Sequence, residues 1–493
     1  MTEAAAGLAL VAGLVFFDAF AGPRASSSPG LRSFAGTAVL LAAGTTLFGA
    51  LLGLTGAWIV SAILVVMLAA ALTLVSNIKR SVLGEPLVFS DFALVGAVFQ
   101  HPQFYISALK RWQMALLAVG LVVLFALVAG FSTASLAARA AGLSLSAAGG
   151  AILAVLLRLD LWKALEFEPD PDRDVLRHGL VATTLAYWSR WRRQPDPDRC
   201  EHPAIAGRSN QLVVIIQCES FTDPADLFDD PSLALPGLEA ARSMSLQSGR
   251  LNVSGFGAYT MRTEYGVLFG RGEDQLGMRR FDPFLTARGE ASWALSNRLG
   301  HADWTSIFVH PHDLRFYGRH KLMPQAGFNR LVGEDAFAPP VSEEGRYVTD
   351  QAVCDKIFEI ADNANGATMI YAVTIENHGP WPPDKPDKEE GQLRNGTAYL
   401  RLLRRSDAML SRLLDRLPAL GRPVTLCFFG DHRPSIPMVS EPGQASHTPY
   451  VIASFGPDGV PLKSSGEDEE LTPAQLHHSI LAAIDSWEGE GKQ

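Results

Sequence analysis

The sequence lacks several features that mark common protein classes. It has four cysteines in 493 residues, and none falls in a CxxC or zinc-ligand spacing; they are Cys200, Cys218, Cys354 and Cys427. Cys218 and Cys427 lie in apolar runs typical of buried strands, so we expect neither a structural disulfide nor cysteine catalysis. The chain has no long block of Lys and Arg, and its net charge is −9. We therefore expect no nucleic acid as a partner.

Charged residues are scarce in the first 165 residues, which contain long apolar runs instead. A membrane-spanning helix needs about 20 mostly apolar residues to cross about 30 Å of hydrocarbon. The runs that qualify are Ala4 to Phe20, Phe34 to Leu54, Trp58 to Val75, Met114 to Phe131 and Leu143 to Leu161. Five buried helices of a soluble protein would show polar faces that these runs lack. We therefore predict a bundle of five transmembrane helices over residues 1–163.

The sequence around these runs bears on membrane retention, orientation and contact with the membrane surface. The first run lacks the basic start and cleavage site of a signal peptide, so we expect it to be retained. Basic residues near the ends of the runs favour neither orientation consistently. Residues Leu83 to Tyr105 are interrupted by proline and are interpreted as an interfacial amphipathic segment. Residues 164–208 are predicted to form a linker with an amphipathic helix, which rests either on lipid headgroups or against the soluble domain; its apolar residues are Leu176, Leu180, Leu185, Trp188 and Trp191.

Residues 209–493 alternate strand-like and helix-like stretches, which is typical of an α/β sandwich domain with a mostly parallel sheet. The predicted strands are Leu212 to Cys218, Thr305 to His310, Ala367 to Ile375, Pro423 to Phe429 and Pro449 to Phe455. Between the third and fourth strands, apolar residues recur at helical spacing from Tyr399 to Leu417. We predict that this helix packs its apolar stripe into the core.

Polar residues capable of metal binding or acid-base chemistry follow four of these strands. They are Glu219 after the first, His310 and His312 at the second, Asn377 and His378 after the third, and Asp431 and His432 after the fourth. Ligands of open α/β sheets bind beyond the carboxyl ends of the strands. Alone, Glu219 is more often a loop carboxylate, whereas the Gly-Asp-His end of the fourth strand is a stronger signal. Together they predict a cation site with oxygen and imidazole ligands.

A candidate nucleophile lies in the stretch from Asn252 to Gly270. A Gly-x-Gly turn there leads into Thr260 and a helix-like run. A hydroxyl at a helix N-terminus feels the positive end of the helix dipole, and a bound metal would lower its pKa toward neutrality. The alternative is that Thr260 only caps the helix.

Five motifs in order resemble a known family: QCESF, GFGAYTMRTEYG, FVHPHDLRFYGRH, ENHGPW and FFGDH. Preceded by apolar helices and the GEPLVFSDF segment, they are similar to the lipoteichoic acid synthase and phosphoglycerol transferase family of the alkaline phosphatase and sulfatase superfamily. The resemblance covers essentially the whole chain. It implies that Glu219, Thr260, Asp431 and His432 bind a divalent metal, usually Mn²⁺, with Mg²⁺ or Zn²⁺ as alternatives.

The resemblance also implies roles around the metal. Thr260 would be the nucleophile and His378 a proton donor, while the substrate-binding residues would be His310, Tyr317, Arg319 and His447. Tyr317 stands where relatives often have tryptophan, and His312 where they have an acidic or amide residue, so the acceptor side of the pocket is expected to differ. The Cys/Ser-x-Pro-x-Arg motif of true sulfatases is absent around Thr260, so sulfate-ester chemistry is not expected.

The function implied by the resemblance is transfer of glycerol phosphate from phosphatidylglycerol to an envelope glycan through a phospho-threonine intermediate. The protein would be a multi-pass bacterial inner-membrane enzyme with its catalytic domain on the periplasmic side. Three alternatives stay open from the residues. They are phosphoethanolamine transfer, hydrolysis by a metal-dependent phosphodiesterase of the sulfatase family, and a membrane scaffold that retains an inactive fold.

Overall fold

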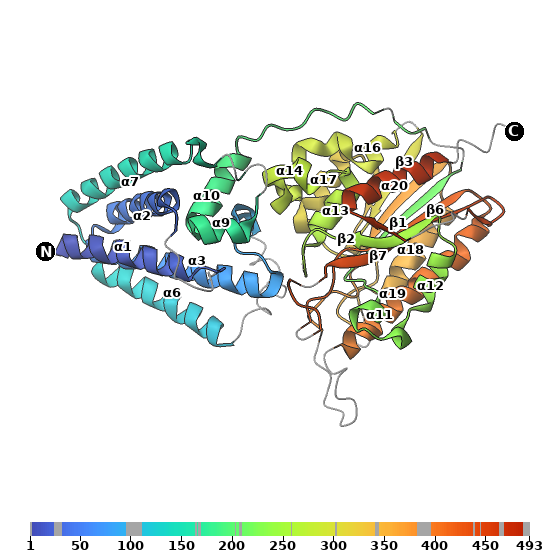
Figure 1. The fold of residues 1–493 in the computed structure, drawn as a ribbon, viewed down its shortest axis with the longest axis horizontal. Coiled ribbons are helices and arrows are strands. Elements are labelled where there is room, and N and C mark those ends of the chain that lie inside the picture. Colours follow the sequence, from blue (N-terminus) through green and yellow to red (C-terminus); the bar gives the residue numbers. More distant parts are fainter. Residues whose placement is uncertain are drawn as a thin grey trace, which may run out of the picture. The chain divides into compact units, whose positions relative to one another are not determined.

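The computed structural model describes residues 2–23, 32–94, 111–162, 165, 169–202, 204–206, 210–257, 259–300, 303–340, 345–381, 396–436, 439–443, 445–462 and 468–486. The chain folds into two compact units, Met1–Gln194 and Pro195–Gln493 (Figure 1). The boundary falls where the apolar helices end and the charged, strand-rich sequence begins.

The first unit is built from long apolar helices. They are α1 (Thr2–Phe20), α2 (Phe34–Thr55), α3 (Trp58–Leu83), α6 (Arg111–Phe131) and α7 (Leu136–Leu156). Four of them, α1, α2, α3 and α7, contain stretches long and apolar enough to cross a membrane. Helix α6 adds a fifth apolar helix of 21 residues. The expected N-terminal bundle of apolar helices is therefore confirmed.

The boundary predicted for the last of these helices was wrong. Helix α7 begins at Leu136 rather than Leu143, because the Ser135 side chain accepts a hydrogen bond from the backbone N–H of Ala138 and caps the helix. Arg139 therefore lies inside the first turn, where its guanidinium donates to the carbonyl oxygens of Thr133 at 3.1 Å and Gly53 at 3.4 Å. These contacts satisfy the hydrogen-bonding needs of the Arg139 guanidinium.

The amphipathic helix predicted after the bundle is two helices, α9 (Pro171–His178) and α10 (Leu180–Trp191). They break at Gly179, where φ is +89° and an added Cβ would lie 2.2 Å from an Asp18 carboxylate oxygen. The other oxygen of that carboxylate accepts the Leu180 N–H at 3.0 Å. Both helices thus pack within the first unit, and Tyr187 is fully buried there.

Only part of the predicted interfacial segment falls within the described residues. Phe89–Leu94 form a 3-10 helix, η1, and residues 95–105 lie outside the described ranges. The Phe89 ring stacks on Trp191 of α10 at a centroid distance of 5.3 Å. Lys79 and Asp91 form an ion pair at 2.7 Å, which ties the segment to α3.

The second unit contains one nine-stranded mixed sheet with the order β4-β3-β5-β1-β6-β7-β2-β9, and β8 pairs with β7. The strands are β1 (Leu212–Cys218), β2 (Gln247–Asn252), β3 (Trp304–Val309), β4 (Arg330–Val332), β5 (Ala367–Val373), β6 (Val424–Gly430), β7 (His447–Phe455), β8 (Pro461–Leu462) and β9 (Glu469–Leu471). The five strands from β4 to β6 are parallel, while β7 runs antiparallel to β6 and β2. The predicted mostly parallel sheet is confirmed.

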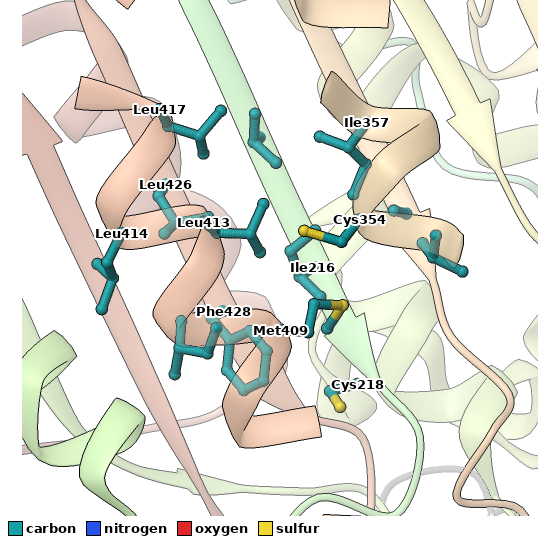
Figure 2. Close-up of a cluster of buried hydrophobic side chains, with 14 of the residues drawn as sticks. Ile216, Cys218, Cys354, Ile357, Met409, Leu413, Leu414, Leu417, Leu426 and Phe428 are labelled. Atoms are coloured by element: carbon teal, nitrogen blue, oxygen red, sulfur yellow. The ribbon is translucent and has the colours of Figure 1, made fainter. Parts of the chain in front are cut away.

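Helices cover both faces of this sheet (Figure 1). The principal ones are α12 (Pro236–Ser243), α13 (Thr260–Phe269), α18 (Asp350–Asp362), α19 (Thr397–Arg416) and α20 (Pro473–Asp485), and the short ones are α11 (Pro224–Leu227), α14 (Glu273–Leu276), α15 (Pro283–Thr286), α16 (Leu295–Arg298) and α17 (Arg319–Gln325). Helix α19 carries the predicted apolar stripe. Figure 2 shows its Met409 and Leu413 beside Ile216 of β1 and Phe428 of β6, in the buried core of the unit.

Candidate active site

Three potential metal ligands converge at the carboxyl edge of the parallel strands. Strand register pairs Cys218 of β1 with Gly430 of β6, so Glu219 and Asp431 leave the sheet at the same level. One ligand atom each from Glu219, Asp431 and His432 lies within 4.8 Å of the others, and all three residues are buried. The His432 Nε2 atom is 3.4 Å from Glu219 Oε1 and 3.7 Å from Asp431 Oδ2.

The backbone around this cluster is tightly fitted. A Cβ on Gly430 would lie 2.0 Å from the carbonyl oxygen of Phe221, so only glycine permits this approach. Ser220 has a φ of +50°, a left-handed conformation that is strained for a residue with a side chain. In this conformation its N–H donates to Asp431 Oδ1 at 2.8 Å, and its hydroxyl donates to Glu219 Oε1 at 2.8 Å.

Sequence reasoning missed Ser220 and also Thr374. Thr374 directly follows β5, and its hydroxyl accepts a hydrogen bond from the backbone N–H of Glu219 at 3.0 Å. The only available signal was position, because Ser220 directly follows Glu219 and Thr374 directly follows β5. Ser220 orients the Glu219 carboxylate, and Thr374 holds the Glu219 backbone.

The charged groups of the cluster shift one another's pKa values. Burial alone would raise the pKa of Glu219, but the charges of His378 and His432 and hydrogen bonds from His432 and Ser220 bring it down to about 2. Burial raises the pKa of Asp431 to about 7, helped by Glu219 and opposed by His432. Burial lowers the pKa of His432, but the neighbouring Asp431 and Glu219 carboxylates outweigh it and raise that pKa to about 9.

These observations fit a divalent cation. Asp431 Oδ2 is buried and has no hydrogen-bond partner of normal geometry among the described residues. A buried carboxylate oxygen without a donor is costly unless a proton or a cation neutralises it. Two carboxylates and an imidazole are suitable ligands for Mn²⁺ or Zn²⁺, and Mg²⁺ favours the oxygen ligands.

Thr260 is the first residue of α13 and is buried, with 7% of its surface exposed. Its hydroxyl acts on the Asp431 carboxyl by hydrogen bonding, which lowers the pKa of that group against the larger effect of burial. The residue before it, Tyr259, provides no side-chain cap. The Thr260 hydroxyl is therefore close enough to Asp431 to affect its pKa, and it lies at the positive end of the helix dipole.

His310 and Arg319 form a second group at the same strand edge. The ring of His310 contacts the Val373 carbonyl oxygen through Nδ1 at 3.0 Å and Arg319 Nη1 through Nε2 at 3.4 Å. Burial and the Arg319 charge hold the pKa of His310 well below its usual value. The ring is therefore neutral, with its proton on Nδ1 and its Nε2 accepting from Arg319, an assignment that follows from the two partners.

His378 lies beside the metal-ligand cluster, since its charge contributes to the low pKa of Glu219. Its Nδ1 contacts the carbonyl oxygen of Gly379 at 2.7 Å, and its ring lies edge-on to Tyr347 at 5.8 Å. With Nδ1 donating to the carbonyl, Nε2 is the ring atom that can exchange a proton with a substrate.

Sequence reasoning also missed Glu264, which is fully buried on α13. Its carboxylate accepts two hydrogen bonds from Arg319, from Nε at 3.0 Å and from Nη2 at 2.6 Å. The signal in the sequence was an acidic residue one turn after Thr260, directly before the largely apolar stretch Tyr265–Phe269.

Of the remaining predicted residues, Tyr317 and His312 lie near Arg319 and His310, whereas His447 does not. Tyr317 has a φ of +56°, and the Arg319 guanidinium lies 5.0 Å from its ring centroid. The His312 ring is 6.1 Å from that of His310. His447 belongs to another group, in which its Nε2 contacts Asp226 Oδ2 at 3.0 Å and Arg433 Nη2 at 2.9 Å.

Comparisons with known proteins agree with this architecture. The sequence profile of the Sulfatase family matches residues 211–485. The chain is 30% identical over 442 residues, 83% of this chain and 79% of the other, to the capsular polysaccharide biosynthesis protein RkpI of Rhizobium meliloti (strain 1021). It is 24% identical over 238 residues, 46% of this chain and 36% of the other, to a protein of the same organism named for cyclic beta-1,2-glucan modification.

Among solved structures, the fold is similar to that of the integral membrane protein lipooligosaccharide phosphoethanolamine transferase A (EptA) from Neisseria meningitidis. The TM-score is 0.55 at 12% sequence identity, and the match covers 97% of this chain and 95% of that chain. This likeness establishes a shared fold for both units, and the profile match establishes the family. The chain belongs to the Sulfatase family.

Proposed function

We propose that the protein is a metal-dependent phosphoglycerol transferase of the bacterial inner membrane. It moves glycerol phosphate from phosphatidylglycerol to an envelope glycan by way of a covalent threonine intermediate. The observation that supports this proposal is that the Thr260 hydroxyl acts on Asp431, one of three potential metal ligands that cluster with Glu219 and His432. Apolar helices in the same chain supply the membrane anchor that a lipid donor requires.

The residues divide the chemistry between them. Glu219, Thr260, Asp431 and His432 would hold the metal, whose contribution is Lewis-acid polarisation of the hydroxyl and the phosphate. The Thr260 hydroxyl releases its proton to solvent and its oxygen attacks phosphorus, while the bond between phosphorus and the diacylglycerol oxygen breaks. That oxygen takes a proton from Nε2 of His378, which enters the step protonated on both ring nitrogens. The product of this step is glycerophospho-threonine.

The second step reverses the roles. An acceptor hydroxyl gives its proton to Nε2 of His378 and its oxygen attacks phosphorus. The bond from phosphorus to the Thr260 oxygen breaks, and that oxygen regains a proton from solvent. Arg319 lies at the same strand edge and offsets charge on the phosphate oxygens, a contribution worth about 2.7–4 kcal/mol for one well-placed donor. His310 stays neutral and holds the guanidinium at Nη1.

The acceptor is proposed to be a glycan of the cell envelope. The two Rhizobium meliloti relatives are named for capsular polysaccharide biosynthesis and for cyclic beta-1,2-glucan modification. Both names refer to polymers of sugars, whose hydroxyl groups match the acceptor chemistry of the second step. We place the catalytic unit on the periplasmic side, where such glycans occur.

The test is intact-mass analysis of the full-length protein in detergent after incubation with phosphatidylglycerol and Mn²⁺. We expect an increment of one glycerophosphoryl group on wild type and none on Thr260→Ala. Thr263→Ala is the matched control, because Thr263 lies on the same helix, is 1% exposed and has a buried hydroxyl with no hydrogen-bond partner among the described residues. An adduct that persists in Thr260→Ala would exclude Thr260 as the nucleophile.

The second candidate is phosphoethanolamine transfer, which is favoured by the fold match to the Neisseria meningitidis transferase along the whole chain. It uses the same nucleophile with a different headgroup. Incubation with phosphatidylethanolamine in the same assay distinguishes the two by the mass of the adduct. Release of free glycerol phosphate without labelled glycan would instead identify a hydrolase.

A further inference from the structure

The carboxylate that pairs with Arg319 is not part of the metal-ligand cluster. Glu264 lies on α13, four residues after Thr260. Residues four apart on a helix project from the same face, about 6 Å apart along the axis. The Glu264 carboxylate binds the Nε and Nη2 atoms of Arg319 on α17. One helix therefore carries both the candidate nucleophile and the anchor of the candidate phosphate-binding arginine.

The Glu264 carboxylate is itself held in place by side chains of the sheet. Gln217 of β1 is fully buried, and its Nε2 lies 3.5 Å from Glu264 Oε2. The hydroxyl of Tyr371 on β5 donates to Gln217 Oε1 at 2.9 Å. A chain of hydrogen bonds thus runs from two central strands through Glu264 to Arg319. Because none of these side chains is more than 2% exposed, the guanidinium has little freedom to rotate.

The partners of Arg319 also leave it donors for a substrate. A guanidinium has five N–H donors in a fixed planar fork. Three of them bind Glu264 and His310. The Nη1 and Nη2 atoms each carry one further N–H, so a phosphate oxygen can be bound while the fork stays locked. The paired carboxylate also offsets the charge of a buried guanidinium, which would otherwise be costly.

We infer, on the basis of the proposed function, that Glu264 is a positioning residue for phosphoryl transfer. It sets the place of the Arg319 guanidinium relative to the Thr260 oxygen and does not touch the substrate itself. The ion pair is therefore more than a contact that stabilises the fold. Its loss is expected to slow the chemical step without weakening metal binding, because the three carboxylate and imidazole ligands keep their own hydrogen bonds.

The variant that tests this is Glu264→Gln in the full-length protein. The amide offers one acceptor oxygen in place of two, so it cannot bind Nε and Nη2 side by side, and Arg319 is free to shift. A misplacement of about 1 Å costs about 100-fold in rate. We expect adduct formation with phosphatidylglycerol to slow by about that factor per active site, with the adduct amplitude reporting the active fraction. The Mn²⁺ concentration that gives half-maximal rate should not change.

Glu290→Gln is the matched control. Glu290 is also fully buried and bridges two arginines, Arg279 at 2.8 Å and Arg271 at 2.9 Å. Its loss breaks buried ion pairs of the same kind, yet it has no described contact with Thr260 or Arg319. We expect a comparable drop in stability with an adduct rate close to wild type.

If Glu264→Gln does not fold, Tyr371→Phe tests the same chain more gently. Removing the hydroxyl loosens Gln217 without leaving a buried charge, and the loss of one hydrogen bond is expected to slow the adduct rate by up to about 10-fold. A wild-type rate per active site in Glu264→Gln, or an equal loss in Glu290→Gln, would overturn the inference. Absence of any adduct on wild type would instead refute the proposed function.

Discussion

Substitution of Gly430 by alanine tests whether the close backbone approach at the metal-ligand cluster is needed for activity. The new methyl carbon would lie 2.0 Å from the Phe221 carbonyl oxygen, whereas real Cβ atoms stay at least 3.0 Å from such neighbours. The two segments must therefore separate by about 1 Å, a displacement that costs about 100-fold in rate when it reaches catalytic groups. Asp431 directly follows Gly430, and Ser220 directly precedes Phe221.

The displacement acts on both carboxylate ligands, since Ser220 donates to Glu219 and to Asp431. We expect Gly430→Ala to raise the Mn²⁺ concentration for half-maximal activity and to slow adduct formation by about 100-fold. The overpacked strand end should also cost about 1–3 kcal/mol of unfolding free energy. Metal titration, adduct mass and urea unfolding measure the three effects separately.

Gly421→Ala is the control, because Gly421 lies just before the other end of β6. Its φ is +66°, and an added Cβ would meet nothing within 4 Å. The strain of a left-handed alanine costs about 1–2 kcal/mol of stability and should leave the site unchanged. A Gly430→Ala protein with a wild-type metal response and adduct rate would refute the reasoning.

Three further predictions follow from the same structure. Burial, helped by the Glu376 charge, raises the pKa of Asp350 to about 7; the folded protein then holds a proton that the unfolded chain releases near pH 4, so stability falls as pH rises from about 4 to about 7. Asp350→Asn should remove this dependence and stabilise the protein relative to wild type above pH 7. Urea unfolding at pH 5 and pH 8 measures this, and an equal change in unfolding free energy at both pH values would contradict it. Leu413→Ala removes a fully buried side chain of α19 and should lower the unfolding free energy by about 2–5 kcal/mol without changing the adduct rate per folded molecule. Removing divalent metal with a chelator should lower the melting temperature, and free Mn²⁺ at about 100 times its Kd should restore about 2.7 kcal/mol; an unchanged melting temperature would argue against a metal site.

Much of the fold could be predicted from local patterns. The first predicted strand, Leu212 to Cys218, has the same bounds in the structure. A short, continuous apolar run is typical of a central parallel strand that is buried on both faces. The strand β2 was missed, since its residues Gln247–Asn252 are largely polar and become a strand only by pairing with β7 and β9. The break at Gly179 was missed because it depends on a carboxylate from α1.

The sequence by itself determined which chemical groups stand at the ends of the parallel strands. Strand register then follows from apolar patterning, which places Glu219, Asp431 and His432 at the same edge of the sheet. Only the tertiary structure decided how those groups are oriented and paired. These orientations depend on contacts between residues from 1 to 221 positions apart in the chain, which include the two donors of Ser220, the pairing of Arg319 and the contacts of His447. Such contacts are selected by packing geometry, which no local pattern encodes.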